Sequence, residues 1–330
     1  METRQLGRTG LQVSELGFGC GAVGGLLIQG DHKDKVAAVA RALEAGITYF
    51  DTARAYGDGA SEASLGTVLQ ELQADAVIGT KVDLRNGEMS DIEGSIIASV
   101  EGSLKRLRRE RVDLIQLHNV VGHQRDPDRR QVSIADVEAA LNAFETLKQQ
   151  GKVRFYGING LGETEALHRG LRLGEADTVQ SCFNLINPTA GLPAPPGFPF
   201  QNYERLIDTA AAQGMGVIAI RVLAAGALSG SAHRAANAAP RVTPIGTAAT
   251  FAEDVKLAHR FDGLIEAGYV DSLVEAAIRF AISKPEVSTT MVGISNMAQL
   301  EQAIAFANRG PLPTGALAHL NEIWTGFAET

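Results

Sequence analysis

The sequence has little cysteine and no excess of positive charge. Among 330 residues only Cys20 and Cys182 are cysteines, with no CxxC pair, so we expect neither a disulfide framework nor a structural zinc site. Such sparse cysteine fits a reducing compartment. The formal net charge is −8, which argues against a general binder of nucleic acids or anionic membranes, because such proteins depend on an excess of lysine and arginine.

Long hydrophobic runs are also missing. Residues 1–10 are polar and carry two arginines, so they lack the apolar core of a signal peptide. The most apolar stretch, 214–230, contains Arg221 and several glycines and is too short and broken to span a bilayer. Hydrophobic residues nevertheless make up 45% of the chain, which excludes intrinsic disorder. We therefore expect a soluble, cytoplasmic, globular protein with no membrane or nucleic-acid partner.

Short apolar runs alternate with amphipathic stretches along the whole chain. Continuous rather than alternating apolar runs are typical of strands that are buried on both faces of a parallel sheet. Eight such strands are predicted, at 15–19, 47–50, 76–80, 112–117, 155–159, 178–181, 216–220 and 288–292.

Helices are predicted between these strands. Ser90 and Glu93 have the spacing of a capping box, and apolar residues follow them at helical intervals as far as Leu107. The other helices are predicted at about 34–45, 62–72, 134–149, 162–173, 202–213, 271–283 and 297–307. Eight strand–helix units in one domain over residues 1–330 favour a (β/α)8 TIM barrel. A doubly wound open sheet competes, because the number of strands does not exclude it.

Three segments lie outside the eight units. Residues 4–6 and 11–13 predict a β-hairpin ahead of the first strand. The stretch 187–200 holds five prolines and predicts a long loop, as does the small and polar stretch 230–246. In a barrel both loops would follow strands, on the carboxyl-terminal face where barrel enzymes keep their active sites.

A GxGxxG pattern, Gly19-Cys20-Gly21-Ala22-Val23-Gly24, follows the first strand. The dinucleotide fingerprint of an open sheet needs the last glycine to begin a helix, whereas residues 25–31 predict a loop. We therefore interpret these glycines as a rim that lets a flat ring approach the backbone closely.

Three consecutive predicted strands end in chemically active residues. Asp51, Lys81 and His118 each have an ordinary explanation when taken singly: a helix cap, a surface lysine, a structural histidine. Together they would meet on one face, with Tyr56 five residues beyond Asp51. An ammonium favours the phenolate of a tyrosine, and a carboxylate holds that ammonium in place. Such a tyrosine is suited to acid–base work on a carbonyl oxygen, which a histidine could orient.

These residues, in this order and spacing, resemble the aldo-keto reductase superfamily over nearly the whole chain. The match includes 6–14, the block from Asp51 to Glu62, Lys81, and 103–107 leading to His118. The resemblance implies a barrel that binds NADPH or NADH without a Rossmann domain. It also implies that Tyr56 is the general acid/base, tuned by Asp51 and Lys81, with His118 orienting the substrate.

The resemblance further implies a set of cofactor-binding residues. They are Cys20, Gly21, Asp51, Asn159, Gln180, Ile220, Arg221, Leu223, Gly226, Gly293, Ser295, Asn296, Gln299 and Gln302. Asn159 and Gln180 would meet the nicotinamide carboxamide. Ile220 stands where many members have a stacking tyrosine, and Arg221 is a candidate for the pyrophosphate. Many NADPH-preferring members have an arginine near Asn296, so the preference between NADP and NAD stays open.

The sequence therefore predicts an NAD(P)-dependent oxidoreductase that moves a hydride between nicotinamide and a small carbonyl, alcohol or sugar substrate. Both aldehyde or ketone reduction and aldose oxidation remain open, and so does the oligomeric state. One alternative is a nucleotide-binding regulatory subunit of the same fold with little turnover. Another is a metal-dependent barrel lyase, but the remaining histidines lack the spacing of metal ligands, so no metal is predicted.

Overall fold

The computed structural model describes residues 1–329, in which eight parallel strands close into a barrel. Around the barrel their order is β10-β11-β12-β3-β4-β5-β6-β9. The strands are β3 (Leu16–Gly19), β4 (Tyr49–Asp51), β5 (Val77–Val82), β6 (Val112–Leu117), β9 (Val153–Gly160), β10 (Thr178–Cys182), β11 (Gly216–Ile220) and β12 (Val287–Gly293). Closure confirms the predicted (β/α)8 barrel and rules out the open sheet. That residues 1–330 act as one domain stays a prediction.

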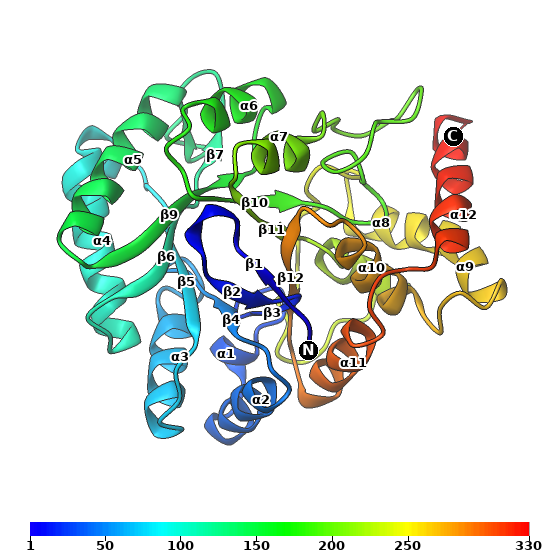
Figure 1. Cartoon of the computed structure of the whole chain (residues 1–330), viewed down its shortest axis with the longest axis horizontal. Helices are drawn as coiled ribbons and strands as arrows, with labels where there is room; N and C mark the ends of the chain where they lie inside the picture. Colours follow the sequence, from blue (N-terminus) through cyan, green and yellow to red (C-terminus); the bar gives the residue numbers. More distant parts are fainter. Residues whose placement is uncertain (330) are drawn as a thin grey trace.

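Helices surround the barrel, as Figure 1 shows. The eight that alternate with strands are α2 (His32–Glu44), α3 (Ala60–Glu71), α4 (Ile92–Leu107), α5 (Ile134–Gln149), α6 (Thr164–Arg172), α7 (Leu206–Ala212), α10 (Leu273–Ile282) and α11 (Met297–Ala307). Further helices are α1 (Leu26–Gln29), α8 (Phe251–Ala258), α9 (Gly263–Glu266) and α12 (Thr314–Thr325). Short 3-10 turns are η1 (Gly7–Thr9), η2 (Glu88–Ser90), η3 (Ala224–Ser229), η4 (His259–Phe261) and η5 (Gly326–Glu329).

The predicted hairpin closes the amino-terminal end of the barrel. Its strands are β1 (Thr3–Gln5) and β2 (Gln12–Ser14), displaced by about one residue from the predicted ranges. Leu6, Leu11 and Val13 pack into a buried cluster with barrel residues that include Tyr49 and Leu114. The hairpin lies across the near end of the barrel in Figure 1. Because this end is sealed by apolar side chains, access to the barrel is left to the opposite end.

Two local predictions were wrong. The N-cap of α4 is Asp91 rather than Ser90: the Asp91 carboxylate accepts from the amide of Gly94 at 3.0 Å. Ser90 lies in η2, where its hydroxyl donates to the carbonyl of Gly87 at 2.7 Å, so it is not available for capping. The expected loop after Gly24 contains the one-turn helix α1, because Leu26 and Leu27 fold down into the core.

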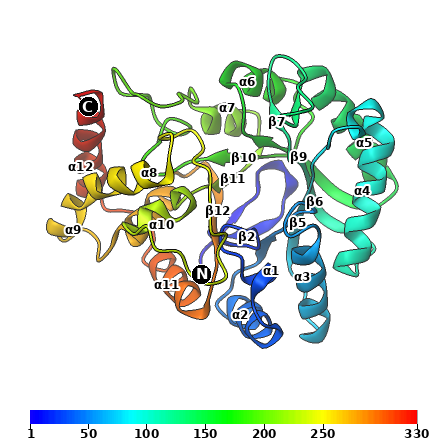
Figure 2. The ribbon, with the colours of Figure 1, turned by 180° about the vertical axis from the view of Figure 1, so that it is seen from behind.

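The two predicted long loops contain no strand and no α-helix. Residues 187–200 run between β10 and α7, and 230–246 run between η3 and α8. Seen from behind, in Figure 2, they lie on the side of the barrel away from the hairpin. Asn187 ties them together, since its Nδ2 donates to the carbonyls of Gln201 at 2.8 Å and Gly246 at 2.5 Å. A small sheet of β7 (Val120–Val121) and β8 (Gln131–Val132) lies in the loop after β6.

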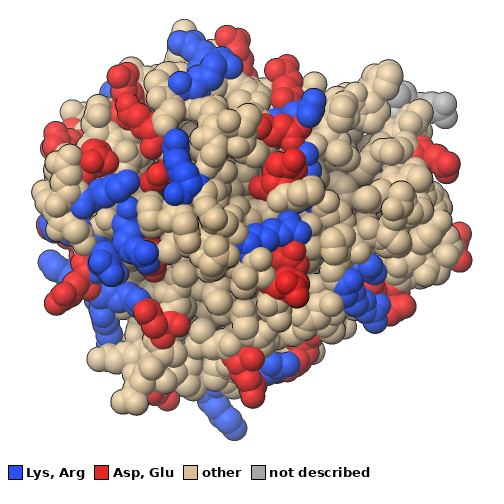
Figure 3. All heavy atoms as spheres, in the orientation of Figure 1, with Lys and Arg blue, Asp and Glu red and all other residues tan. Residues whose placement is uncertain are grey.

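The surface mixes charges of both signs. On the face shown in Figure 3, lysine and arginine side chains are interspersed with aspartate and glutamate rather than gathered into one patch. Within residues 1–329, none of the helices combines the length and the apolar character that a membrane span requires. The predicted cytoplasmic location and the predicted absence of nucleic-acid and membrane partners stay predictions.

Candidate active site

Four predicted side chains meet at the carboxyl-terminal end of the barrel. Asp51 ends β4, Lys81 lies in β5 beside it, and His118 follows β6 directly. Tyr56 lies in the loop between β4 and α3. Parallel strands bring their carboxyl ends to the same edge, so residues 25 or more positions apart in the sequence become neighbours. The structure thus assembles the set that the spacing predicted.

Lys81 connects Asp51 and Tyr56 within this cluster. Its ammonium pairs with Oδ1 of Asp51 and donates to the carbonyl of Thr52 at 2.8 Å and to the hydroxyl of Tyr56 at 3.3 Å. The same nitrogen lies over the Tyr56 ring, 4.8 Å from its centroid. Lys81 is only 1% exposed, so these contacts replace its hydration.

Two donors hold the other side of the Asp51 carboxylate. Oδ2 accepts from the Tyr49 hydroxyl at 3.1 Å and from Nε2 of Gln180 at 2.7 Å. The carboxylate, 5% exposed, therefore has partners from β4, β5 and β10. A buried charge with this many donors is fixed in one orientation.

Electrostatics keeps Tyr56 protonated in this arrangement. Burial raises the pKa of Tyr56 above its ordinary value, and Asp51 adds to this effect, while Lys81 and Arg221 act against it. The Lys81 ammonium thus lowers the pKa of Tyr56 as expected, but burial and Asp51 together raise it by more. For Lys81, burial alone would lower the pKa, yet Asp51 and Tyr56 together raise it, so the ammonium stays charged.

His118 is neutral in this site. Burial, together with the positive charges of Lys81 and Arg130, lowers the pKa of His118 to about 3. Its ring meets the Tyr56 ring edge-on, at 83° with centroids 5.7 Å apart. A neutral imidazole next to a protonated phenol orients a substrate oxygen by hydrogen bonding rather than by supplying the proton.

A cavity of about 420 Å³ opens over Tyr56 and His118. It extends from these two side chains along the ends of β9, β10, β11 and β12 to the start of α11. Most predicted cofactor residues line it: Gly21, Asp51, Asn159, Gln180, Ile220, Arg221, Leu223, Gly226, Gly293, Ser295, Gln299 and Gln302. The cavity therefore joins the acid–base group to the surface expected to hold a dinucleotide.

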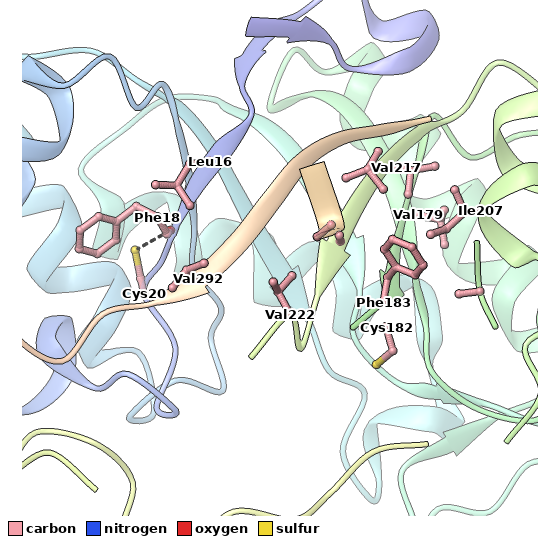
Figure 4. Close-up of a cluster of buried hydrophobic side chains, with 14 of the residues drawn as sticks. Leu16, Phe18, Cys20, Val179, Cys182, Phe183, Ile207, Val217, Val222 and Val292 are labelled. Atoms are coloured by element: carbon pink, nitrogen blue, oxygen red, sulfur yellow. Dashed lines mark hydrogen bonds between the residues drawn. The ribbon is translucent and has the colours of Figure 1, made fainter. Parts of the chain in front are cut away.

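Two predicted cofactor residues do not line this cavity. Cys20 is 1% exposed, and its Sγ contacts the carbonyl of Phe18 at 3.7 Å within the hydrophobic core, as Figure 4 shows. Asn296 caps α11, its Oδ1 accepting from the amide of Gln299 at 3.0 Å. Cys20 thus serves as a small core residue, and the Asn296 side chain is committed to the helix.

The residues present fit a nicotinamide. Oδ1 of Asn159 is buried and has no hydrogen-bond partner among residues 1–329, while its Nδ2 donates to the carbonyl of His118 at 3.2 Å. An unpartnered buried acceptor is costly, and a carboxamide NH₂ would satisfy it. Gln180 commits its amide nitrogen to Asp51, which leaves its oxygen for the same carboxamide.

Close packing explains why glycines occupy the rim after β3. A Cβ at Gly21 would lie 3.2 Å from the Tyr56 ring, tighter than ordinary packing. The flat ring that approaches this backbone is therefore Tyr56 itself. Gly24 lies so close to the backbone of Ile294 that a side chain there would overlap it.

Sequence reasoning missed Arg234, which lines the cavity. Its guanidinium donates to the carbonyls of Val23 at 3.1 Å, Ala225 at 2.8 Å and Ala239 at 2.5 Å. Asn237 nearby donates to the carbonyl of Ser295 at 2.9 Å. The loop 230–246 thus spans from η3 to the rim after β3. The sequence marked this loop as a candidate, but no local pattern singled out Arg234.

Comparison with known proteins decides the family. The family model described as "Aldo/keto reductase family" matches residues 15–325. The chain belongs to the aldo/keto reductase family. L-galactose dehydrogenase of Arabidopsis thaliana is 30% identical, over 92% of this chain and 88% of that protein. D-threo-aldose 1-dehydrogenase of a Pseudomonas species is 27% identical, over 95% of this chain and 94% of that protein.

A solved structure shows the same fold. The holo form of aldo-keto reductase AKR11C1 from Bacillus halodurans aligns with a TM-score of 0.70 and 24% identity, covering 98% of this chain and 96% of that one. As an aldo/keto reductase, the protein is an NAD(P)-dependent oxidoreductase that acts on small molecules. In residues 1–329, no group of three or more histidine, cysteine, aspartate or glutamate side chains is placed to hold a metal ion.

Proposed function

We propose that this aldo/keto reductase transfers a hydride between a nicotinamide dinucleotide and a carbonyl or alcohol carbon, with Tyr56 as the general acid/base. One observation carries the proposal: Tyr56 lines the cavity and its hydroxyl receives a hydrogen bond from Lys81 at 3.3 Å, while Asp51 pairs with the same ammonium. Such a tyrosine can exchange a proton with a substrate oxygen that enters the cavity.

The chain's own residues then have distinct roles. Tyr56 gives its proton to the carbonyl oxygen during reduction and takes it back, as phenolate, during oxidation. Lys81 stabilises that phenolate, and neutral His118 donates a second hydrogen bond to the same oxygen. Asn159 and Gln180 orient the carboxamide, and the bound nicotinamide supplies or accepts the hydride. Val222, Leu223 and Ile245 line the cavity with apolar surface, which favours the exclusion of water.

We infer that the substrate is an aldose, oxidised at its hemiacetal carbon. The names of two relatives that match over nearly the whole chain, L-galactose dehydrogenase and D-threo-aldose 1-dehydrogenase, support this direction. Aldehyde or ketone reduction uses the same residues in reverse, so both directions belong in the first test.

The test follows nicotinamide absorbance with a panel of aldoses in oxidation and a panel of aldehydes and ketones in reduction. NAD and NADP are compared side by side. Tyr56→Phe should lower kcat by about 10²- to 10⁴-fold while leaving the dissociation constant of the dinucleotide unchanged. Tyr269→Phe, which removes a hydroxyl outside the cavity, is the matched control and should retain full activity. Full turnover by Tyr56→Phe would refute the role of Tyr56.

A second candidate is a nucleotide-binding regulatory subunit. A putative voltage-gated potassium channel subunit beta of Schizosaccharomyces pombe is 27% identical over 91% of this chain and 86% of that protein. Tight dinucleotide binding with no turnover of any substrate in either direction would favour this candidate over the enzyme. If neither dinucleotide binds, both candidates fail.

A further inference from the structure

Tyr49 places a phenol inside the barrel, below the proton-transfer site. Its side chain is fully buried, among the largest of the buried side chains, and its hydroxyl donates to Oδ2 of Asp51 at 3.1 Å. As Asp51 is two residues further along β4, both side chains point to the same face of the strand, the interior of the barrel. A purely apolar contact would not need this hydroxyl.

The neighbouring strands leave room for this phenol. Gly79 on β5 pairs in register with Asp51, and a Cβ there would overlap the Tyr49 hydroxyl. Gly17 on β3 lies beside the ring: a Cβ there would meet Sδ of Met291 first and would lie 3.2 Å from Cδ1 of Tyr49. Glycine inside a strand weakens it and often marks a close approach of another group. β5 therefore lacks a side chain beside the Tyr49 hydroxyl, and β3 lacks one beside the Tyr49 ring.

The Tyr49 hydroxyl stabilises the negative charge of Asp51, and that charge in turn acts on Tyr56. Asp51 carries one negative charge, which Lys81 neutralises at Oδ1 and which Tyr49 and Gln180 stabilise at Oδ2. The Asp51 charge favours the protonated form of Tyr56, whereas the Lys81 charge favours its phenolate. Removal of one donor from Oδ2 leaves the Asp51 charge less balanced, so the field at Tyr56 shifts toward the protonated form.

We propose that Tyr49 is a positioning residue, which holds the Asp51–Lys81 pair from inside the barrel and thereby controls the proton on Tyr56. This inference rests on the proposed role of Tyr56. The charged and titratable groups that act on Tyr56 are Lys81 from β5, Asp51 from β4, His118 after β6 and Arg221 after β11. Those that act on Tyr49 are Asp51, Tyr56 and Cys20.

The test is Tyr49→Phe, which keeps the ring and removes the hydroxyl. The pKa of Tyr56 should rise by about half to one pH unit, as expected for the loss of one hydrogen bond to a charged group. Oxidation needs the phenolate, so its rate should fall about three- to tenfold at a pH below that pKa. Reduction needs the protonated tyrosine, so its rate at neutral pH should stay nearly constant and its alkaline limb should move to higher pH.

A second readout does not depend on turnover. The ultraviolet absorbance of tyrosinate is titrated in the protein without dinucleotide, and the titration of a matching Tyr56→Phe variant is subtracted to isolate Tyr56. Gly79→Ala tests the same contact from the opposite side, because its methyl displaces the Tyr49 hydroxyl without removing it. Both variants should move the Tyr56 titration upward.

Tyr156→Phe is the matched control. Tyr156 is also buried in a barrel strand and also donates to a carboxylate, Oε2 of Glu145 at 3.2 Å, but it packs against α5 on the outside of the barrel. Tyr156→Phe should leave the pH profiles of oxidation and of reduction unchanged. If Tyr49→Phe slows both directions equally at every pH, the hydroxyl is merely structural and the inference falls. If Tyr56→Phe retains turnover, the proposed function itself falls, whatever Tyr49 does.

Discussion

Two polar groups of the cavity region, the Asp51–Lys81 pair and Asn159, differ in how completely the protein satisfies their polar atoms. On the β4–β5 side, Lys81 makes three contacts with oxygen atoms and Asp51 receives three donors. On the β9–β11 side, Oδ1 of Asn159 has no hydrogen-bond partner among the described residues. Left-handed non-glycine residues also cluster after β11, with φ of 56° at Arg221, 46° at Ala224 and 58° at Ala225, whereas the loops after β4 and β6 have one each, Asp58 and Arg130.

We attribute this difference to the proposed separation of proton transfer from dinucleotide binding. In the half proposed for proton transfer, the Asp51–Lys81 pair is organised by the chain alone, so we expect it to need no reorganisation when a substrate arrives. The binding half keeps an unpaired acceptor and strained backbone, features that persist at functional sites because the surrounding structure or a ligand compensates for them. Substitutions around the Asp51–Lys81 pair should therefore lower turnover and stability. Substitutions at Asn159 should instead lower the affinity for the dinucleotide.

Lys81→Met should have the largest effect. It leaves the Asp51 carboxylate buried without its cation, so we expect the free energy of unfolding to fall by about 3–5 kcal/mol. Turnover should fall at least as far as in Tyr56→Phe, by about 10²- to 10⁴-fold, because the phenolate loses its stabilising charge. Denaturant unfolding and steady-state kinetics measure the two losses.

Lys152→Met is the control for that prediction. Lys152 pairs with Glu101 at 2.6 Å, but both side chains are partly exposed, so the pair should contribute less than about 1 kcal/mol. A Lys81 variant that is no less stable than the Lys152 variant would contradict the description of the β4–β5 side as a prearranged, buried ion-pair network.

Much of the proton-transfer half was predictable from the sequence, for a simple reason. In a barrel each strand contributes its last residues to one end, so strand boundaries and spacing suffice to bring Asp51, Lys81 and His118 together. Tyr49 was not predictable, because an aromatic residue in a buried strand is ordinarily a core residue. Its hydroxyl reaches Asp51 beside Gly79 on the neighbouring strand β5, a contact that the local sequence does not indicate.

The binding half was predictable only in part. Gly21, Asn159 and Gln180 line the cavity as expected, whereas the Arg234 contacts depend on how a long loop folds back over the rim. Such contacts are non-local, and no periodicity encodes them. The predicted helix cap at Ser90 was wrong for a related reason: Ser90 and Asp91 are both good caps, and the turn η2 (Glu88–Ser90) takes up Ser90.

Asn159→Ala tests the binding half. Loss of the acceptor for the carboxamide should raise the dissociation constant of the dinucleotide by about tenfold, equivalent to about 1.4 kcal/mol. The pH dependence of turnover should not move, because Asn159 does not contact the Asp51–Lys81 pair. Equilibrium titration with reduced dinucleotide measures the constant directly.

Asn119→Ala sharpens the contrast. This buried asparagine is fully partnered: Oδ1 accepts from the amide of Leu84 at 2.7 Å, and Nδ2 donates to the carbonyls of Leu84 at 2.9 Å and Arg130 at 2.8 Å. Asn119→Ala should therefore lower the free energy of unfolding more than Asn159→Ala does, and it should leave the affinity for the dinucleotide unchanged. Equal losses of affinity in the two variants would show that Asn159 acts only through local packing.

Asn296→Arg should have the smallest effect, and it concerns the choice between NAD and NADP. Asn296 is the N-cap of α11, whose residues Gln299 and Gln302 line the cavity. A guanidinium at this position would supply a charge-assisted contact for a 2′-phosphate, so the affinity for NADPH relative to NADH should rise by about tenfold. The side chain that caps α11 is lost at the same time, which should lower the free energy of unfolding by about 1 kcal/mol.

Asn296→Ala separates these two consequences. It removes the same cap without adding a charge, so it should lose the same stability while the ratio of the two dissociation constants stays as in the parent protein. A shift of that ratio in the alanine variant would mean that the cap itself, through the position of Gln299, governs the preference. If the ratio shifts only in Asn296→Arg, a positive charge at this position is sufficient to favour NADPH, and its absence leaves the choice of dinucleotide open in the parent protein.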